Sequence, residues 1–407
     1  MNVLFITLFD IRNINNSGIY EDLLREFYKN DHNVYIISPT ERRNREKTHF
    51  IENNGCKIIK VKTGNVQKTN LIEKGIATVL LETQYISAIK KYFSNIKFDL
   101  ILYSTPPVTL VRPIKFIKKR DNAKTYLLLK DIFPQNAVDM GILGRKGIKG
   151  LLYKYFRKKE KMLYALSDKI GCMSQANVDY ILKNNPEVNF EKAEICPNSI
   201  DLRDVLISET ERINIREKYG LPLDKKIFVY GGNLGKPQGI SFIIECLKTC
   251  KDIESAFFLI IGSGTEYGKL KNFVEREGSV NTKLFNALPK DEYDKMIAAC
   301  DIGLIFLDHR FTIPNFPSRL LSYMQAKLPV LAATDANTDI GEIIVNNGFG
   351  WWCESNNTED LYNKVVQINN ENLFDMGKKA LQYLIDNYSV KMSYRIIVDG
   401  INAERNC

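Results

Sequence analysis

The chain has 407 residues, too long for one hydrophobic core and suited to two α/β domains of about 200 residues each. Apolar residues make up 44% and charged residues 26%, which excludes a wholly disordered, collagen-like or coiled-coil protein. The longest stretch without a charged residue, Leu100 to Val111, has 12 residues, whereas a membrane-spanning helix needs about 18. The sequence therefore predicts a globular protein that does not cross a bilayer.

The first residues, MNVLFITLFDIR, have no basic residue ahead of the apolar run and predict a strand rather than a signal peptide. We therefore expect a cytoplasmic protein. None of the eight cysteines forms a CxxC motif, and the closest pair, Cys246 and Cys250, has helical spacing. This pattern predicts reduced thiols in the core.

The net charge of +9 is unevenly distributed along the chain. Residues 1–200 carry 33 Lys and Arg against 20 Asp and Glu, and the rest carry 24 against 28. Within residues 112–161 the numbers are 15 and 4. The first half therefore predicts an anionic partner, such as a phospholipid surface or a diphosphate.

Short β-branched runs alternate with segments of helical period. Strands are predicted near residues 2–7, 33–38, 99–104, 125–130 and 169–173, and again near 227–232, 256–262, 282–286, 301–307 and 328–333. This alternation predicts two parallel, doubly wound α/β sheets. We expect a Rossmann-like domain over residues 1–205, a second over 206–385, and a helical tail over 386–407 that packs back on the first domain.

The segment GGNLGKPQG, Gly231 to Gly239, directly follows a predicted strand. Glycines let backbone N–H groups approach a phosphate, a following helix N-terminus favours negative charge, and Lys236 adds a positive charge. The segment predicts a pyrophosphate site, with a simple strand-to-helix turn as the alternative. It is not a P-loop, because no Ser or Thr follows the GK pair.

A second glycine-rich turn, GSGTEYG, spans Gly262 to Gly268 and contains Gly264. Its spacing is GxGxxxG, and no acidic residue ends the next strand where a dinucleotide ribose would need one. We therefore expect a tight turn that lines a nucleotide pocket rather than an NAD site.

The densest polar segment runs from Leu307 to Met324. Pro314 and Pro317 hold it extended, and Ser318 is placed to cap the following helix. Arg319 then lies in the first helical turn, where a positive charge opposes the helix dipole. That position favours an anion ligand over a solvated arginine.

In the first half, Ser17 and Gly18 lie between a strand and a helix and form a second turn able to bind phosphate. Asp131 follows the strand near 125–130, at the sheet edge where doubly wound proteins bind ligands. It is a candidate to orient or deprotonate an acceptor hydroxyl, with a turn cap before Pro134 as the alternative. The sequence has three histidines, which argues against a histidine-rich metal cluster and against a Ser-His-Asp triad.

Residues 146–166 predict an amphipathic helix. Its apolar stripe contains Ile148, Leu151, Leu152, Tyr155, Phe156, Met162 and Leu163, with basic residues largely outside the stripe. A membrane-interface helix has this pattern. So does a helix packed on its own sheet with a solvated basic face, and the latter is the favoured prediction.

Taken together, these segments resemble family 4 glycosyltransferases of the GT-B fold, particularly the bacterial capsule and O-antigen branch with N-acetylfucosamine-type transferases. The resemblance spans nearly the whole chain. It rests, in the family's order, on STPP (104–107), KDIFP (130–134), CPNSID (196–201), GGNLGK (231–236), the GSG turn (262–264) and PNFPSRLLSYMQAKLPVLAA (314–333).

The resemblance implies retaining transfer without a metal ion, with the leaving diphosphate helping to deprotonate the acceptor. The catalytic candidates are Asp131, from its place after a strand, and Lys236 and Arg319, which the resemblance places at the donor diphosphate. The donor-binding candidates are Ser17, Gly18, Gly231, Gly232, Asn233, Gly262, Gly264, Leu288, Ser318 and Ser322. Leu288 would meet the base through its backbone.

One departure concerns the two glutamates, with seven residues between them, that the family usually carries. Pro314 and Ser322 stand at these positions. Ser322 retains a hydrogen bond to ribose without charge assistance, a difference of about 1 kcal/mol. The position where many members place a catalytic histidine is also not histidine, which gives Asp131 more weight.

The sequence therefore predicts transfer of a hexose or N-acetylated amino sugar from a UDP-sugar to a polyprenyl-diphosphate-linked glycan in surface polysaccharide synthesis. We expect peripheral attachment to the inner face of an anionic plasma membrane, with no nucleic acid partner. The alternatives are a UDP-sugar epimerase of the same architecture and a non-catalytic membrane-associated binding subunit.

Overall fold

The computed structural model describes residues 1–53, 55–65, 71–277 and 280–403. The chain forms two compact units. Unit 1 contains residues 1–201 together with the chain from Val390 onward, and unit 2 contains residues 202–389. Each unit is built on its own sheet.

The sheet of unit 1 has the strand order β3-β4-β2-β1-β5-β6-β7-β8. The strands are β1 (Asn2–Ile6), β2 (Asn33–Glu41), β3 (His49–Asn53), β4 (Cys56–Thr63), β5 (Leu100–Thr105), β6 (Lys124–Leu129), β7 (Lys169–Cys172) and β8 (Ala193–Ile195). All pairs are parallel except β3 with β4. The order reverses direction between β1 and β5, which makes the carboxyl ends of these strands the expected place for a ligand.

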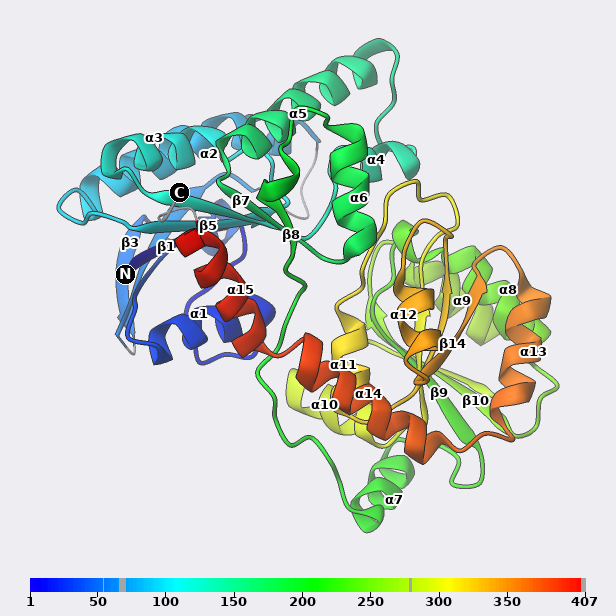
Figure 1. Ribbon diagram of the computed structural model, residues 1–407. Coiled ribbons are helices and arrows are strands. Elements are labelled where there is room, and N and C mark those ends of the chain that lie inside the picture. Colours follow the sequence, from blue (N-terminus) through cyan, green and yellow to red (C-terminus); the bar gives the residue numbers. More distant parts are fainter. Residues whose placement is uncertain (54, 66–70, 278–279, 404–407) are drawn as a thin grey trace. The chain divides into compact units, whose positions relative to one another are not determined.

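The helices of unit 1 cover both faces of its sheet. They are α1 (Ile19–Lys29), α2 (Leu71–Tyr92), α3 (Val111–Asp121), α4 (Gln135–Asp139), α5 (Gly147–Leu166), α6 (Gln175–Asn184) and α15 (Val390–Ala403). Figure 1 shows α2, α3 and α5 on one face and α1 with α15 on the other. Helix α15, drawn in red, packs on α1, β6 and β7, and Tyr394 Oη lies 2.9 Å from His32 Nε2. The last helix is thus part of unit 1.

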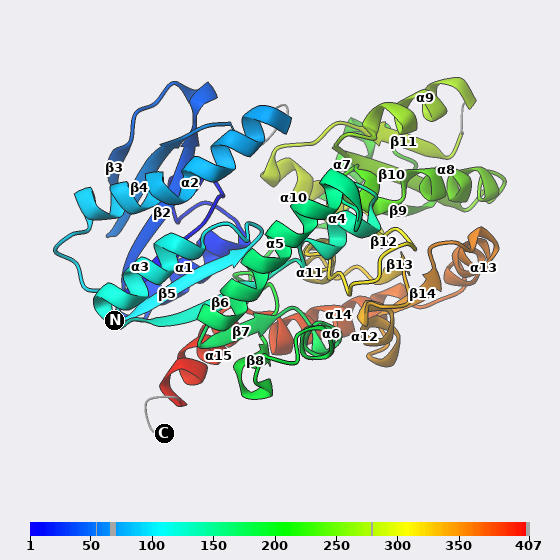
Figure 2. The ribbon, with the colours of Figure 1, turned by 90° about the horizontal axis from the view of Figure 1, so that it is seen from above.

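The sheet of unit 2 is wholly parallel, in the order β11-β10-β9-β12-β13-β14. The strands are β9 (Lys226–Asn233), β10 (Ala256–Ser263), β11 (Thr282–Phe285), β12 (Ile302–Phe306), β13 (Val330–Thr334) and β14 (Gly350–Glu354). The helices are α7 (Glu209–Lys218), α8 (Ile240–Thr249), α9 (Tyr267–Glu277), α10 (Lys290–Ala298), α11 (Arg319–Gln325), α12 (Ile340–Asn346), α13 (Thr358–Ile368) and α14 (Leu373–Asn387). Helices α8, α9 and α13 enclose a hydrophobic core on one face, and α10, α11 and α12 lie on the other (Figures 1 and 2).

The order of this second sheet reverses direction between β9 and β12. The carboxyl ends of these two strands therefore lead into the loops most suited to bind a ligand. The loop after β9 contains Lys236, and the loop after β12 ends at Arg319. Residues that are more than eighty positions apart in the sequence thus meet at one sheet edge.

The predicted α/β class with parallel sheets is confirmed, and all ten predicted strands are present. Four further strands were not predicted: β3, β4, β8 and β14. Strand β8 has three residues and β3 is an antiparallel edge strand, so both give a weak alternating signal. Strand β14, GWWCE, begins with a glycine whose absent side chain avoids the carbonyl of Val330.

Candidate functional site

The glycine-rich segment of unit 2 begins inside the strand rather than after it. The sequence predicted a turn from Gly231, but β9 continues to Asn233, and Gly231 and Gly232 pair in register with Ile261 and Gly262. The turn itself is a 3-10 helix, Lys236–Gln238, followed by Gly239 with φ of +62°. This part of the prediction was wrong because glycine reads as a turn signal even where it serves close packing within a strand.

Two tyrosines, Tyr293 and Tyr323, lie against the strand glycine Gly231. The Gly231 N–H donates to Tyr323 Oη at 3.1 Å, and that hydroxyl donates to the Leu304 carbonyl, also at 3.1 Å. A Cβ on Gly231 would lie 2.2 Å from the hydroxyl of Tyr293. The end of β9 is therefore held in one position by buried aromatic side chains. The sequence reasoning missed these tyrosines, although Tyr323 lies one helical turn after Arg319.

Arg319 begins α11 and lies directly against the end of β9. Its guanidinium carbon lies 4.2 Å from the centre of the Tyr230 ring, a cation–π contact. A Cβ on Gly232, whose φ is +135°, would lie 3.4 Å from Arg319 Nη2. Arg319 Nη1 is buried and has no hydrogen-bond partner among the described residues. The residue as a whole is partly exposed. Because an arginine stays protonated, Arg319 is a cation whose buried Nη1 has unused donors beside a backbone without side chains.

The second glycine-rich turn supports the first. A Cβ on Gly262 would lie 1.9 Å from the Gly232 carbonyl oxygen, and one on Gly264 would lie 2.3 Å from that of Leu234. The Leu234 N–H donates to the Ser263 carbonyl at 2.9 Å, and the Leu234 carbonyl accepts from Glu266 N–H at 2.9 Å. Gly262 and Gly264 thus let two backbones approach each other. Their direct contact with a donor stays a prediction.

Lys236 lies in the first position of the 3-10 turn and is exposed. The adjoining polar side chains are paired within the turn, since Asn233 Nδ2 donates to Gln238 Oε1 at 2.9 Å and Gly235 N–H donates to the same oxygen at 3.2 Å. This network fixes the turn, and Lys236 extends from it into solvent.

The remaining donor-binding candidates lie near the same sheet edge. Ser318 occupies the N-cap position of α11, but its side chain makes no capping hydrogen bond, contrary to the prediction. Its backbone is already α-helical, with φ of −63° and ψ of −15°, which is not the extended geometry that a capping side chain needs. Pro314 is buried, Ser322 is partly exposed on α11, and Leu288 is partly exposed in the loop between β11 and α10. The ligand roles of Ser322 and Leu288 stay predictions.

Four polar side chains that the sequence analysis did not single out lie in the loops after β12 and β13. Asn337 Nδ2 donates to the Phe311 carbonyl and Thr338 Oγ1 to the Asn315 carbonyl, both at 2.6 Å, which ties the two loops together. Asn315 Nδ2 and Asp335 Oδ2 are buried without a partner in the described part of the chain. Burial raises the pKa of Asp335 to about 6.

In unit 1, Asp131 follows β6 at the carboxyl edge of the sheet. Its Oδ2 accepts a hydrogen bond from Asn136 Nδ2 at 2.6 Å, while Oδ1 is buried and has no partner among the residues described. Burial raises the pKa of Asp131 to about 6, and the nearby Glu160 carboxylate adds to the shift. Thr105 Oγ1 donates to the Asp131 carbonyl at 2.9 Å and fixes the backbone. Asp131 is therefore a positioned carboxylate with one free oxygen.

The turn at Ser17 and Gly18, which the sequence predicts to bind phosphate, is partly covered by an acidic side chain. Ser17 is exposed, and Gly18 is the N-cap of α1. The Glu21 carboxylate lies over Gly18, where a Cβ would be 2.2 Å from Glu21 Oε2. An anionic side chain thus already faces this helix N-terminus, and a diphosphate would have to displace it.

Helix α5 spans Gly147–Leu166, and the favoured prediction for its apolar stripe was wrong. Ile148 is 79% exposed and Leu151 68%, and Leu152, Tyr155 and Met162 are exposed as well. Of the predicted stripe only Leu163 is buried. The helix packs on unit 1 through a different face, because Glu160 and Tyr164 are buried together with Gly150 and Leu163. Within this face Glu160 accepts hydrogen bonds from Tyr164 and Arg157.

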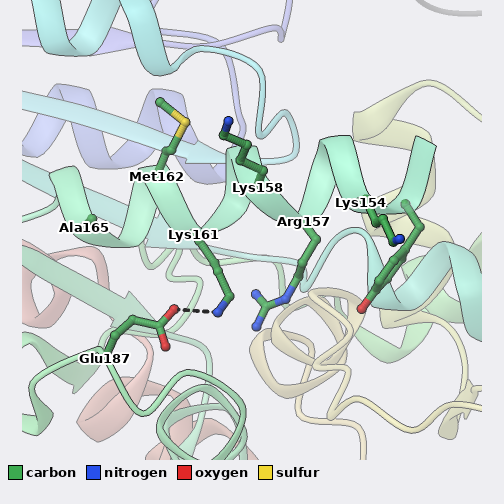
Figure 3. A pocket seen from close by; sticks show the side chains of 8 residues that line it. Lys154, Arg157, Lys158, Lys161, Met162, Ala165 and Glu187 are labelled. Atoms are coloured by element: carbon green, nitrogen blue, oxygen red, sulfur yellow. Dashed lines mark ion pairs between the residues drawn. The ribbon is translucent and has the colours of Figure 1, made fainter. Parts of the chain in front are cut away.

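A basic surface borders this exposed apolar stripe. Lys154, Arg157, Lys158 and Lys161 line a shallow pocket of about 490 Å³ on α5 (Figure 3). Lys161 pairs with Glu187 at 2.9 Å, and Arg157 pairs with Glu160 at 2.6 Å. Lys154 and Lys158 form no ion pair within the described ranges. The helix therefore has a buried, an apolar exposed and a basic face.

Among residues 1–53, 55–65, 71–277 and 280–403, no group of three His, Cys, Asp or Glu side chains is placed to hold a metal ion. The same residues contain no helix with the length and hydropathy of a membrane span. The seven cysteines in this part of the chain are free and buried, as predicted, and Cys407 lies outside it.

Comparison with known proteins gives matches for the whole chain and for its second half. Residues 211–387 match the family model described as Glycosyl transferases group 1. The probable glycosyltransferase WbjE of Pseudomonas aeruginosa is 26% identical over 330 residues, which are 80% of this chain and 79% of WbjE. WcaI of Escherichia coli, named for colanic acid biosynthesis, is 23% identical over 61% of this chain and 60% of its own.

Solved structures share the fold at low sequence identity. Sucrose-phosphate synthase from Thermosynechococcus elongatus has a TM-score of 0.74 at 13% identity, covering 98% of each chain. Anabaena Alr3699/HepE in complex with UDP-glucose has a TM-score of 0.71 at 13% identity, covering 99% of this chain and 100% of that chain. These likenesses confirm the predicted fold of two Rossmann-like units.

Proposed function

We propose that the chain is a glycosyltransferase of group 1 that transfers a hexose or N-acetylated amino sugar from a UDP-sugar to a polyprenyl-diphosphate-linked glycan at a membrane surface. Relatives named for polysaccharide synthesis support the general class of product. The donor and acceptor are proposals that rest on the chemistry of the two sites.

Arg319 carries the proposal for the donor. Its Nη1 is buried and unpaired, and an anion would satisfy it, since burying an unpaired charged donor is costly. The adjacent strand end has no side chain at Gly232 and so admits a bulky phosphate close to the backbone. A UDP-sugar diphosphate matches both features, and Lys236 adds charge at the edge of the site. Asp335 and Asn315 are candidate partners for sugar hydroxyls.

Asp131 carries the proposal for the acceptor. Its free Oδ1 is able to accept a hydrogen bond from an acceptor hydroxyl, and a pKa near 6 makes it a better base than an ordinary aspartate while leaving it ionised at pH 7. We propose that Asp131 orients this hydroxyl and that the leaving diphosphate shares in its deprotonation. We further propose that Arg319 and Lys236, in place of a metal ion, stabilise the diphosphate as it departs.

Helix α5 carries the proposal for the membrane. Ile148, Leu151 and Tyr155 belong to a solvent-exposed apolar stripe, whose exposure to water is energetically unfavourable. Lysines lie beside this stripe. An interfacial helix buries such a stripe among lipid chains while its basic face meets anionic headgroups. Each Lys or Arg near an anionic leaflet contributes about 1 kcal/mol. Attachment of this kind would bring a lipid-linked acceptor to unit 1.

The first experiment tests sugar transfer. A thermal-shift panel of nucleotide sugars identifies the donor, because a bound ligand stabilises the native state. With that donor, Arg319→Ala should lower turnover about 100-fold or more, the usual loss when a stabilising donor to developing charge is removed. Arg276→Ala, at an exposed arginine on α9, is the matched control. Near-normal turnover in Arg319→Ala would reject the proposed donor site.

The second experiment tests the membrane surface. The wild type should float with vesicles of mixed phosphatidylcholine and phosphatidylglycerol, and Leu151→Ser with Ile148→Ser should leave most of the protein unbound. Phe374→Ser, at a similarly exposed residue of unit 2, is the control for a general loss of hydrophobicity. Equal flotation of all variants would exclude α5 as the membrane contact.

A further inference from the structure

Unit 2 contains a pocket of about 620 Å³ at the edge of its sheet formed by β14. We name it the edge pocket. It is lined by Ala336, Thr338, Asp339, Gly341, Glu342, Val345, Asn346, Gly350, Trp351, Trp352, Lys364 and Gln367. We infer that the edge pocket is a non-catalytic binding site for an oligosaccharide. Its size lies in the range of about 300–1,000 Å³ that is typical of small-ligand sites.

Trp352 gives the edge pocket a rigid aromatic wall. Its indole Nε1–H donates to Thr334 Oγ1 at 2.8 Å, so the only polar atom of the ring is already satisfied. The ring rests on Gly341, where a Cβ would lie 2.4 Å from Trp352 Cδ1. The side chain is partly exposed. A fixed indole of this kind presents an apolar face on which the C–H groups of a sugar ring can pack.

Polar side chains flank this wall from two helices. Helix α12 provides Glu342 and Asn346, and helix α13 provides Lys364 and Gln367. Neither Glu342 nor Lys364 has a hydrogen bond or ion pair in the part of the chain that the structure describes. A carboxylate accepts hydrogen bonds, an ammonium donates them, and an amide does both, which together match the hydroxyl groups of a sugar.

The composition of the edge pocket favours a glycan over a peptide strand. Strand β14 ends the described sheet, so its outer backbone groups are an alternative site for an added strand. An added strand needs an open edge with apolar pockets for alternate side chains. Here side chains of α12 and α13 line both sides, and Val345 is the only aliphatic residue larger than alanine among the lining residues. One aromatic face with several hydroxyl-binding groups is the chemistry of saccharide recognition.

This inference goes beyond sugar transfer, because the edge pocket shares no residue with the Arg319 site. The two are linked through the loop after β13, where Thr338 Oγ1 donates to the Asn315 carbonyl at 2.6 Å. A glycan held in the edge pocket would keep its chain near the enzyme between encounters and raise its effective concentration. The enzyme would then prefer long acceptors to short ones.

Intrinsic fluorescence offers a specific assay, because Trp351 and Trp352 are the only tryptophans of the chain. The full-length protein is first screened against an array of bacterial surface oligosaccharides, and the strongest binder is then titrated while tryptophan emission is followed. We expect a saturable change in emission. Glu342→Ala and Gln367→Ala should each weaken binding roughly tenfold, as expected for loss of a hydrogen bond to a sugar hydroxyl.

Asn363→Ala, an exposed position of α13 outside the edge pocket, should bind as the wild type does. Both polar variants lie on the surface and should retain the wild-type circular dichroism and the wild-type rate on a short acceptor, which separates this inference from the proposed transfer reaction. No binder on the array, or binding that is indifferent to both variants, would overturn it. A dimer in light scattering that Glu342→Ala dissociates would overturn it in favour of strand pairing.

Discussion

The two candidate sites hold opposite charges by different means. In unit 2 the cation Arg319 lies against an aromatic ring, beside a strand end that Tyr293 and Tyr323 contact. In unit 1 the anion Asp131 follows β6 and has one amide partner, Asn136. Each leaves one buried atom without a partner in the described chain, Nη1 in the first and Oδ1 in the second. One site is thus prepared for an anion and the other for a hydroxyl group.

The Arg319 and Asp131 sites should differ in how their charge depends on pH. An arginine remains charged at every accessible pH, so its site should bind diphosphate with little dependence on pH. A carboxyl group with a pKa near 6 changes state within the working range. We therefore expect the pH dependence of the enzyme to originate in unit 1, and its dependence on the donor phosphates in unit 2.

Asp131→Asn should have the largest effect. Removing a general base usually costs a factor of about 100 to 10,000 in turnover. In the wild type, turnover should rise with pH through about 6 as Asp131 ionises, and this rise should be absent in the variant. A pH–rate profile of both proteins, with the donor at saturation, measures this. The same rise in both would show that another group titrates.

The same substitution should stabilise the fold at neutral pH. The folded-state pKa of Asp131 is raised from 3.8 to about 6, so the folded state favours the protonated form. The contribution of Asp131 to the free energy of unfolding is largest below pH 3.8, where the carboxyl group is protonated in both states. This contribution is lost as pH rises through about 6. Asp131→Asn should therefore exceed the wild type in melting temperature above pH 6, with the difference disappearing near pH 4. Lower stability at pH 8 would contradict this account.

Lys236→Ala should have an intermediate effect, because this lysine is exposed and its charge is screened by solvent. We expect turnover to fall about fivefold to tenfold, less than in Arg319→Ala, and the loss to shrink at high salt. Steady-state kinetics at two ionic strengths, with the exposed Lys251→Ala as control, tests this. A loss of kcat as large as that of Arg319→Ala would place Lys236 inside the site.

Tyr323→Phe should have the smallest effect on turnover but a clear one on stability. The hydroxyl accepts from Gly231 and donates to Leu304, so its loss should lower the free energy of unfolding by about 1–3 kcal/mol. Tyr103→Phe, which removes a buried hydroxyl paired with Ser167 at 2.7 Å in unit 1, is the control. Urea unfolding should show similar losses, whereas only Tyr323→Phe should raise the donor KM. Equal donor KM values would show that the tyrosine does not position the strand end.

The sequence predicted the features that depend on local pattern. The alternation of strands and helices predicted two parallel sheets, and the positions of Arg319 and Asp131 after strands predicted their places at the sheet edges. Both follow from the rule that loops after parallel strands meet at one edge. The positive charge in the first turn of α11 predicted a ligand contact, and that contact stays a prediction.

Features that depend on tertiary packing were not accessible in this way. Tyr293 and Tyr323 contact Gly231 from separate helices, and nothing in their local sequence indicates this. Helix α5 has an apolar stripe that suits either a sheet or a membrane, and only the burial of Glu160 and Tyr164 shows which face packs inward. Glu21 over Gly18 is a similar case, since a side chain three residues away covers the turn.

Calorimetric titration of UDP, UMP and uridine into the wild type and Arg319→Ala is the most direct test of the central claim, that Arg319 and the end of β9 form a diphosphate site. We predict that the wild type binds UDP far more tightly than UMP or uridine and that Arg319→Ala loses most of this difference, while uridine binds both proteins equally weakly. Equal affinity of both proteins for UDP would contradict the account.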